Sequence, residues 1–140
     1  MGSLVKFFIF FLCSQFAQSQ ITTGNDIHVI VENIKSNKGT IYMAIYDTEA
    51  SFLTTEYKGA IVPIENHTCR YTFKDIPEGI YAISLFHDEN DNGTMDTNFV
   101  GIPKEDYGCS NNAKGFMGPP KWKDAKFEIK DQVITQTIML

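Results

Sequence analysis

The stretch IHVIVENIKSNKGTIYMAIY, residues 27–46, decides the fold class of this chain. Its apolar residues recur with a period of two, so that Ile27, Val29 and Val31 point to the same face of an extended strand. A second alternating run starts at Ile41, after a Ser-Asn-Lys-Gly sequence that is typical of a turn. The pattern predicts a β-hairpin. It excludes an amphipathic helix, in which apolar residues would recur every three or four positions.

Strands are expected along the rest of the chain as well. Further apolar runs lie at 60–65, 68–74, 80–87, 123–130 and 133–140. The run 80–87 is apolar on both faces, which is typical of a central strand, whereas Pro63 lacks a backbone N–H and assigns its strand to a sheet edge. Thr48 is expected to cap a short helix that ends near Gly59. About seven strands joined by short turns predict an all-β fold, an antiparallel β-sandwich of the immunoglobulin or prealbumin type.

The composition is that of one folded domain. The chain has 140 residues, is 43% hydrophobic and carries a formal net charge of −5. These values exclude a disordered chain. The acidic balance argues against nucleic acid as a partner, because binding to phosphates needs clustered Lys and Arg. The sequence has neither a zinc-binding pattern nor the motif of a nucleophilic hydrolase.

The N-terminal residues indicate export. Lys6 precedes a short apolar run, and Ala17 and Ser19 have the spacing of the small residues at a signal-peptidase site. We therefore expect residues 1–19 to be a signal peptide and residues 20–140 to be a single domain that is secreted or periplasmic. The apolar run is too short to cross a bilayer, which needs about 20 apolar residues. No transmembrane segment is expected in the mature chain.

Residues 88–120 form a long segment without periodicity, and function is expected there. Its first part has oxygen-bearing residues at the spacing of a calcium-binding loop: Asp88, Asn90, Asn92, Thr94 (through its backbone carbonyl) and Asp96. Gly93 would supply the sharp bend that such a loop makes. The last position of the pattern is a bidentate Glu in an EF-hand but Phe99 here, so Glu105 or Asp106 would have to complete the shell.

Calcium is the cofactor that this spacing suggests. Only two of the expected ligands carry a formal charge, which predicts weak binding with a Kd of roughly 10⁻⁴ to 10⁻³ M. The alternative is a polar surface loop that is held by Asx turns and binds no metal. The spacing is compatible with both.

His87 precedes the loop at the end of a strand. It is a candidate metal ligand, or the general base of a hydrolase in which Asp88 and Glu105 assist. The alternative is a packed histidine that holds the loop through a hydrogen bond. Because no nucleophile or catalytic-metal pattern accompanies His87, the sequence favours a non-enzymatic protein.

Aromatic residues are spread through the second half of the segment. Tyr107, Phe116 and Trp122 would form a stacking surface for a glycan or a peptide if they are exposed together. The alternative is that they fold back as a small core of the loop itself. Cys69 and Cys109 are a possible disulfide, because export permits oxidation, and otherwise they are two buried thiols.

Several motifs together resemble a known family. The strings HDENDNGTMDTN (87–98), GIPKE (101–105) and GPP (118–120), with IPEGIYA (76–82) before them, resemble the secreted bacterial family named domain of unknown function 2141. The resemblance spans nearly the whole mature chain. It implies an exported bacterial protein but brings no established activity and no catalytic residues. The Pro-x-Gly-x-Tyr turn is also similar to transthyretin-like and carboxypeptidase-regulatory-like sandwiches.

The function that the sequence favours is an exported, non-enzymatic module that binds a surface glycan, a peptide or a protein. A hydrolase built on His87 and a purely structural component of the cell envelope are the alternatives.

Overall fold

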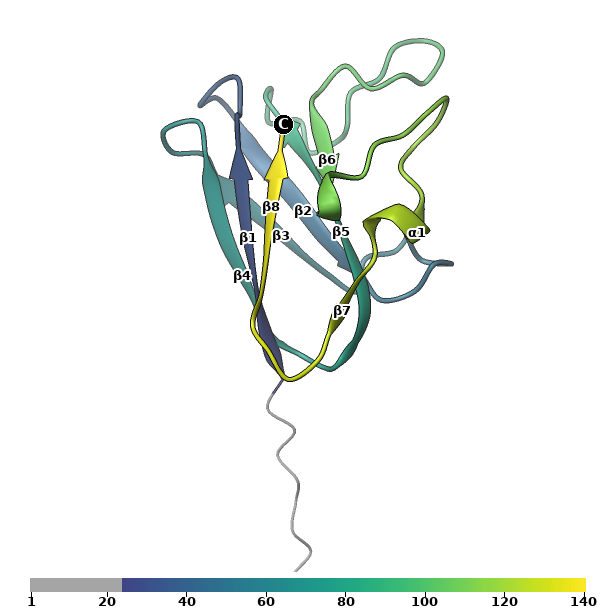
Figure 1. Ribbon diagram of the computed structural model, residues 1–140. Coiled ribbons are helices and arrows are strands. Elements are labelled where there is room, and N and C mark those ends of the chain that lie inside the picture. The colour runs from purple at the N-terminus through teal and green to yellow at the C-terminus, as the bar shows by residue number, and fades with distance from the viewer. Residues whose placement is uncertain (1–23) are drawn as a thin grey trace, which may run out of the picture.

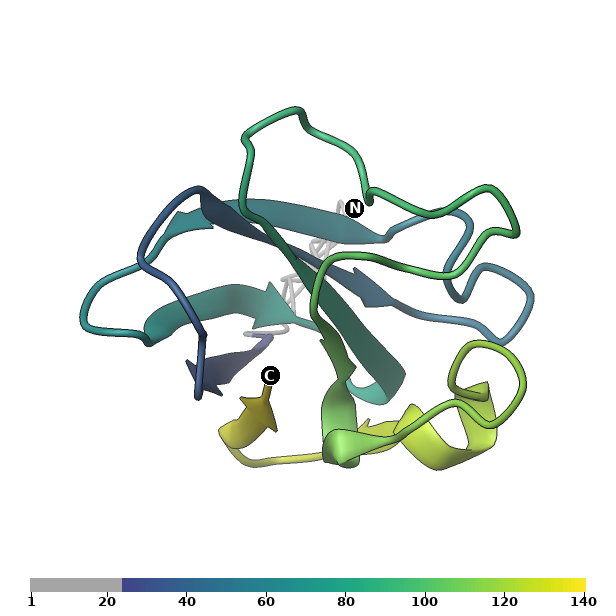
Figure 2. The same cartoon turned by 90° about the horizontal axis from the view of Figure 1, so that it is seen from above.

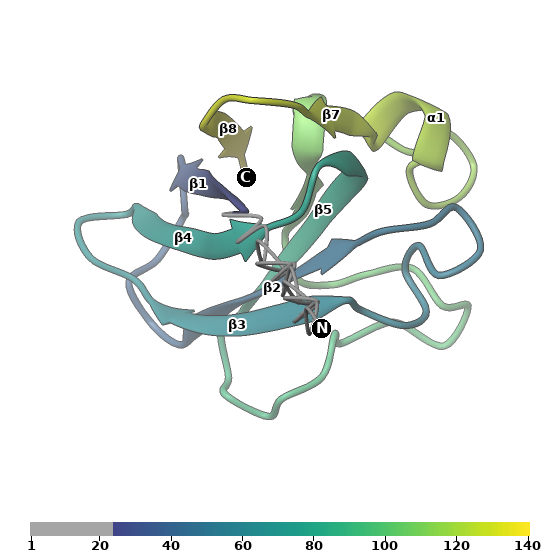
Figure 3. The same ribbon diagram turned by 90° about the horizontal axis from the view of Figure 1, so that it is seen from below.

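Two β-sheets face each other across the main core in the computed structural model of the protein, which describes residues 24–140 (Figures 1 and 3). The first sheet has the order β4-β1-β8 and consists of β4 (Cys69–Ile76), β1 (Asn25–Glu32) and β8 (Ile134–Met139). The second has the order β3-β2-β5-β6 and consists of β3 (Lys58–Pro63), β2 (Thr40–Tyr46), β5 (Gly79–Asp88) and β6 (Tyr107–Cys109). A short strand, β7 (Phe127–Ile129), pairs with the start of β5. The predicted all-β sandwich is confirmed.

The apolar alternation places side chains as predicted. Ile27, Val29 and Val31 of β1 are fully buried and belong to one cluster with Ile41 and Ile45 of β2. Removing one such side chain from water contributes about 1.5–3 kcal/mol to stability. The strand β5 is central, between β2 and β6, and the proline-bearing strand β3 lies at the edge of its sheet, as predicted.

The first two strands do not form the predicted hairpin, and that prediction was wrong. The strand β1 pairs with β4 and β8, whereas β2 pairs with β3 and β5. The connection between them crosses from one sheet to the other, and Ile34, which is 2% exposed, enters the core on the way. Alternation fixes which face of a strand is buried but not which strand lies beside it, so both topologies satisfy the same pattern.

The pairing of β1 with β8 is parallel, from Ile27 opposite Ile134 to Glu32 opposite Met139. The other strand pairs in the described residues are antiparallel. A parallel pair needs a long connection, and here nearly the whole domain lies between the two strands. The first sheet therefore joins the two ends of the domain.

The segment after β2 forms turns in place of the predicted helix. Thr48 caps the first turn as expected, since its Oγ1 accepts a hydrogen bond from the Ser51 amide N–H at 3.1 Å. The Thr48 carbonyl accepts one from the Phe52 amide N–H at 3.1 Å. The turn cannot continue as a helix because Leu53 has a φ of 62°, in the left-handed region.

The long segment is partly structured. It contains β6 and a 3₁₀ helix, η1 (Ser110–Asn112), and the predicted strand 123–130 begins instead as the short helix α1 (Trp122–Ala125) before β7. The fully buried Ser110 hydroxyl donates to the Ala125 carbonyl at 2.5 Å and accepts a bond from the Ile83 amide N–H at 2.9 Å. This hydroxyl ties α1 to β5.

Figures 1 and 2 show where the remaining parts of the segment lie. Residues 89–106, and then residues 113–121, extend from one side of the sandwich in both views. The predicted signal peptide, residues 1–19, lies outside the described residues. Among the helices described, none is long and apolar enough to cross a membrane.

Candidate metal centre and the adjoining groove

The candidate loop begins at the end of β5 with a carboxylate that has no access to solvent. Asp88 is 0% exposed. Its Oδ1 accepts a hydrogen bond from the Asn92 amide N–H at 3.1 Å, and its Oδ2 accepts one from the Gly93 amide N–H at 2.8 Å. The backbone turns back on Asp88 in this way because Gly93 adopts a φ of 79°, which glycine takes without steric cost. The bend predicted at this glycine is present.

The two asparagines of the loop connect Asp88 to Asp96. Asn90 Oδ1 accepts a bond from the Asn92 amide N–H at 3.2 Å, and Asn92 Oδ1 accepts one from the Thr94 amide N–H at 3.0 Å. The Nδ2 groups of both asparagines donate to the Asp96 carboxylate, at 2.5 Å and 2.8 Å. The residues predicted as metal ligands thus lie in one hydrogen-bonded cluster.

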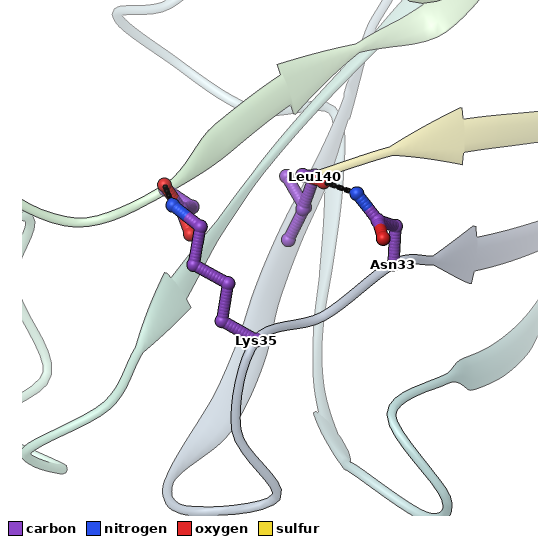
Figure 4. Close-up of polar contacts among 4 residues, drawn as sticks. Asn33, Lys35 and Leu140 are labelled. Carbon is purple, nitrogen blue, oxygen red and sulfur yellow. Dashed lines mark hydrogen bonds and ion pairs between the residues drawn. The ribbon is translucent and has the colours of Figure 1, made fainter.

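Glu105 lies against this cluster although it is far along the chain. Its Oε1 accepts a hydrogen bond from the Glu89 amide N–H at 3.2 Å, and its Oε2 accepts one from the Asp96 amide N–H at 3.0 Å. Asp106, the other residue considered for the shell, forms an ion pair with Lys35 at 2.8 Å instead (Figure 4). Of the two acidic residues, Glu105 is therefore the one beside the loop.

A closed turn brings Glu105 back to the loop. Thr97 and Pro103 form an antiparallel bridge, and the Lys104 amide N–H donates to the Asp96 carbonyl at 2.8 Å. The Lys35–Asp106 ion pair anchors the chain directly after Glu105, and beside it the Asn33 side chain donates to the Leu140 carbonyl at 2.7 Å (Figure 4). The spacing of residues in the loop therefore does not predict that Glu105 lies beside it.

The chemistry of the cluster is that of hard oxygen donors. In the described part of the chain, no three His, Cys, Asp or Glu side chains lie close enough to hold a metal by themselves. A cation here would therefore need amide and carbonyl oxygens beside the carboxylates, which is the donor set of calcium and not of zinc. Because an amide oxygen has two lone pairs, Asn90 Oδ1 keeps one while accepting a backbone hydrogen bond. Asn92 Oδ1 accepts two bonds, from the Thr94 amide N–H at 3.0 Å and from the Thr94 hydroxyl at 3.2 Å, so the hydroxyl would have to turn away for this oxygen to bind a cation.

His87 is packed and hydrogen-bonded. The side chain is 3% exposed, and its Nε2 donates to the Lys38 carbonyl at 2.6 Å. Its backbone N–H donates to the Asp106 carbonyl at 2.9 Å. Neighbouring residues of a strand point to opposite faces, so His87 and Asp88 do not face each other. In this arrangement His87 holds the turn before β2, which matches the packed alternative.

The three aromatic candidates do not share one surface. Trp122 packs edge-on against Phe52, with ring centroids 5.7 Å apart, and borders a small cluster of buried residues from β5, β6 and α1. Phe116 is 89% exposed, and Tyr107 is 41% exposed. The predicted stacking surface is therefore divided, and Trp122 belongs to the core of the segment.

A groove that the sequence did not reveal lies on the outer face of the second sheet. Its volume is about 860 Å³, and its floor is formed by Ser84 and Phe86 of β5 with Tyr107 of β6. Residues 100–103 and residues 117–120 also line it. Residues 80–87 are apolar on both faces, a pattern that predicts a central strand. An apolar outer face of β5 also indicates that this face is covered by another segment or binds a ligand.

A second hollow of about 600 Å³ continues this face toward β3. It shares Ser84 and Phe86 with the groove, and Tyr42 of β2 stacks on Phe86 with ring centroids 5.2 Å apart. The outer face of the sheet thus has an aromatic ridge with a hollow on each side.

The possible disulfide is not formed. Cys69 and Cys109 are free and buried, and they lie in different clusters: Cys69 in the main core and Cys109 in the small cluster beside Trp122. Burial raises the pKa of the Cys69 thiol to about 11 and that of Cys109 to about 12. Both thiols therefore stay protonated at neutral pH, and thiols react through the thiolate.

A labelling experiment tests this arrangement of the cysteines. In residues 20–140, which include every described residue, we expect both thiols to react slowly with an aromatic disulfide reagent at pH 8 and both to react at once in denaturant, without prior reduction. Fast labelling of the native protein would contradict the burial. Fewer than two thiols in unreduced, denatured protein would show that a disulfide forms.

The fold and the site define the class of protein: a β-sandwich whose long loop gathers oxygen donors at the end of a central strand. Residues 29–137 match the family described as an uncharacterized protein conserved in bacteria, domain of unknown function 2141. The chain belongs to this family, as the motifs indicate. No curated protein matches the chain.

Proposed function

We propose that this protein is an exported, non-enzymatic binding module whose loop 88–105 binds calcium and so holds one wall of the groove in place. The observation that carries the proposal is the buried Asp88 carboxylate. It is 0% exposed, and its two hydrogen-bond partners are neutral backbone N–H groups. A buried carboxylate with no cationic partner is costly, and a bound cation removes that cost.

The loop 88–96 offers five of the six to eight oxygens that calcium requires. Asp88, Asn90, Asn92 and Asp96 would each supply a side-chain oxygen, and Thr94 its backbone carbonyl. Calcium bound there would neutralise the carboxylates and fix their relative positions. This chain's own hydrogen bonds already hold the donors near one another, so little ordering would accompany binding.

Glu105 is the residue that would take the place of the missing bidentate ligand. Phe99 stands at that place in the local pattern and is 100% exposed, so it contributes nothing to the cluster. The closed turn after Asp96 returns the chain so that the Glu105 carboxylate lies beside the Asp96 amide, at 3.0 Å. The ligand set would thus be completed by a detour of the chain and not by continuous spacing.

The loop and the groove are parts of one structure. Met95 lies between Thr94 and Asp96 of the cluster, residues 100–103 lie between Asp96 and Glu105, and both line the groove. A cation that fixes Asp96 and Glu105 would therefore fix this wall, because both ends of the intervening turn are attached to it. The groove itself is largely apolar, and we propose that it accepts a peptide or glycan of the cell surface.

The melting temperature in calcium tests the proposal. With a Kd of roughly 10⁻⁴ to 10⁻³ M, 10 mM calcium should stabilise residues 20–140 by about 1.4–2.7 kcal/mol, through RT ln(1 + [L]/Kd). Magnesium at the same concentration should have a smaller effect, because it tolerates crowded, irregular oxygen shells poorly. A protein that melts at the same temperature in calcium and in chelator would refute the metal site.

The variant Glu105→Gln tests which acidic residue completes the shell. Removing one charged ligand should weaken calcium binding about tenfold, because affinity in such loops follows the number of charged ligands. The matched control is Glu128→Gln, which changes an exposed carboxylate on β7. A full calcium response in Glu105→Gln would remove this residue from the site.

A further inference from the structure

We propose that the protein docks on an anionic lipid surface through the tips of two loops that flank the groove. The first arm is residues 97–104, and the second arm is residues 113–121. Both arms border the same groove, since residues 100–103 and residues 117–120 line it. Figures 1 and 2 show both arms extending from the same side of the sandwich.

The tips of the arms carry the three most exposed large apolar side chains of the described residues, Phe99, Met117 and Phe116. Phe99 is 100% exposed in the first arm, where Val100 and Ile102 are 61% and 59% exposed. Phe116 and Met117 are 89% and 94% exposed in the second arm. Scattered exposed apolar residues are ordinary, but five on two adjacent loop tips mark an interaction site.

The first arm is a built structure that holds its apolar side chains outward. The Asn98 Oδ1 accepts hydrogen bonds from the Val100 amide N–H at 3.0 Å and from the Ile102 amide N–H at 2.9 Å. The Asn98 amide N–H donates to the Ile102 carbonyl at 2.9 Å. These bonds fix the backbone of the tip, so the apolar side chains are presented without a large loss of entropy on binding.

The second arm is held by a close approach of its own backbone. A Cβ atom on Gly115 would lie 1.8 Å from the Gly118 carbonyl oxygen, so only glycine permits this turn. Met117, between them, adopts a positive φ of 54°. The tip that carries Phe116 and Met117 is thus tightly folded although both side chains are exposed.

The charges around the tips identify the partner. The two arms contain Lys104, Lys114 and Lys121 and no acidic residue, and all three lysines are exposed. The rest of the chain carries nine Lys and Arg against seventeen Asp and Glu, from the totals of 12 and 17. Asp96 and Glu105 border the first arm, but the arms themselves carry only basic charges on an acidic protein, which is complementary to an anionic surface.

A bilayer suits this arrangement better than a folded partner does. Phe99 and Phe116, the aromatic side chains of the two tips, lie on separate arms and outside the lining of the groove, so a protein would need two matching hollows to receive them. In a bilayer the apolar tips would enter the interfacial region, while lysine stems allow the ammonium groups to stay at the level of the lipid phosphates. Each lysine near an anionic surface raises the affinity for it about fivefold.

Co-sedimentation with vesicles tests the proposal. Residues 20–140, in chelator and low salt, should bind vesicles of phosphatidylcholine with phosphatidylglycerol and bind pure phosphatidylcholine vesicles much more weakly. Phe116→Ser/Met117→Ser should weaken binding at least about tenfold, because the second tip would lose both of its exposed apolar side chains. The matched control is Val133→Ser, which is also exposed, at 57%, in the turn between β7 and β8 at the other end of the sandwich.

A second pair of variants separates charge from apolar insertion. Lys114→Gln/Lys121→Gln should weaken binding to the anionic vesicles by about twenty-fold or more, whereas Lys74→Gln/Lys130→Gln, at exposed positions away from the arms, should not. Because chelator excludes bridging by calcium, failure of the calcium site would leave these results unchanged. Absence of vesicle binding by the folded protein, or equal loss in the control variants, would overturn the proposal and leave the tips to a protein partner.

Discussion

The variant Asp88→Asn is expected to lower the free energy of unfolding by about 2–3 kcal/mol and to remove the stabilisation by calcium. The native carboxylate accepts bonds from two backbone N–H groups, at 3.1 and 2.8 Å, in a site without solvent. An amide of the same shape offers one oxygen and one NH₂ group, so one buried N–H of Asn92 or Gly93 would face another donor. Loss of a charged acceptor for a buried donor costs about this much.

Asp91→Asn is the matched control, because it changes the same atoms in the same loop at an exposed position. The Asp91 carboxylate has only a long contact, 3.4 Å from the Thr40 hydroxyl, and Asn tolerates the positive φ of 55° at this position. We expect its unfolding free energy and its calcium response to match those of the parent protein. Chemical denaturation with and without calcium measures both quantities. If the two variants behave alike, Asp88 has no special role.

The fold was predictable to the extent that burial alone determines it. The alternation at Ile27, Val29 and Val31 predicts a buried face, and all three are fully buried. The same alternation says nothing of whether β1 lies beside β2 or across the core from it. That choice depends on Ile34 entering the core in the crossing segment, a contact between distant parts of the chain.

The apolar alternation also does not determine that β1 pairs with β8 in parallel. Residues 133–140 have the composition of a strand in either direction, and the predicted range agrees closely with Ile134–Met139. The direction relative to β1 follows from how many times the chain reverses its direction between the two strands. No residue of the strand encodes that number, so the sequence predicted the element but not this partner.

In the candidate site, too, some residues could be predicted from local spacing and others are placed by contacts between distant parts of the chain. Asp88, Asn90, Asn92 and Asp96 gather because their spacing makes successive Asx turns, a local property that a sequence displays. Glu105 joins them through the bridge across the first arm, which spacing cannot reveal. Tertiary contacts also explain why Trp122 is packed and Phe116 is exposed. Both are large aromatic residues in polar stretches of sequence, but only Trp122 packs against Phe52.

The variant Gly93→Val is expected to destabilise the protein by about 2 kcal/mol and to expose residues 88–106 to protease, because the bend of the loop depends on a left-handed backbone. Gly93 has a φ of 79°, and a Cβ atom there would have ordinary room, since its nearest neighbour is the Tyr42 hydroxyl at 3.5 Å. The cost is therefore one of backbone strain, which is large for a β-branched residue.

Gly93→Asn separates backbone strain from added volume at the same position. Asn adopts a positive φ more readily than Val. We therefore expect Gly93→Asn to lose about half as much unfolding free energy as Gly93→Val, or less, and to keep part of the calcium response. Limited proteolysis with mapping of the cleavage sites, beside denaturation, distinguishes local opening of the loop from global unfolding. Equal losses in the two variants would attribute the effect to crowding against Tyr42. An unchanged cleavage pattern in Gly93→Val would mean that the loop holds its shape without the bend, and the amide of residue 93 would then have no part in binding the Asp88 carboxylate.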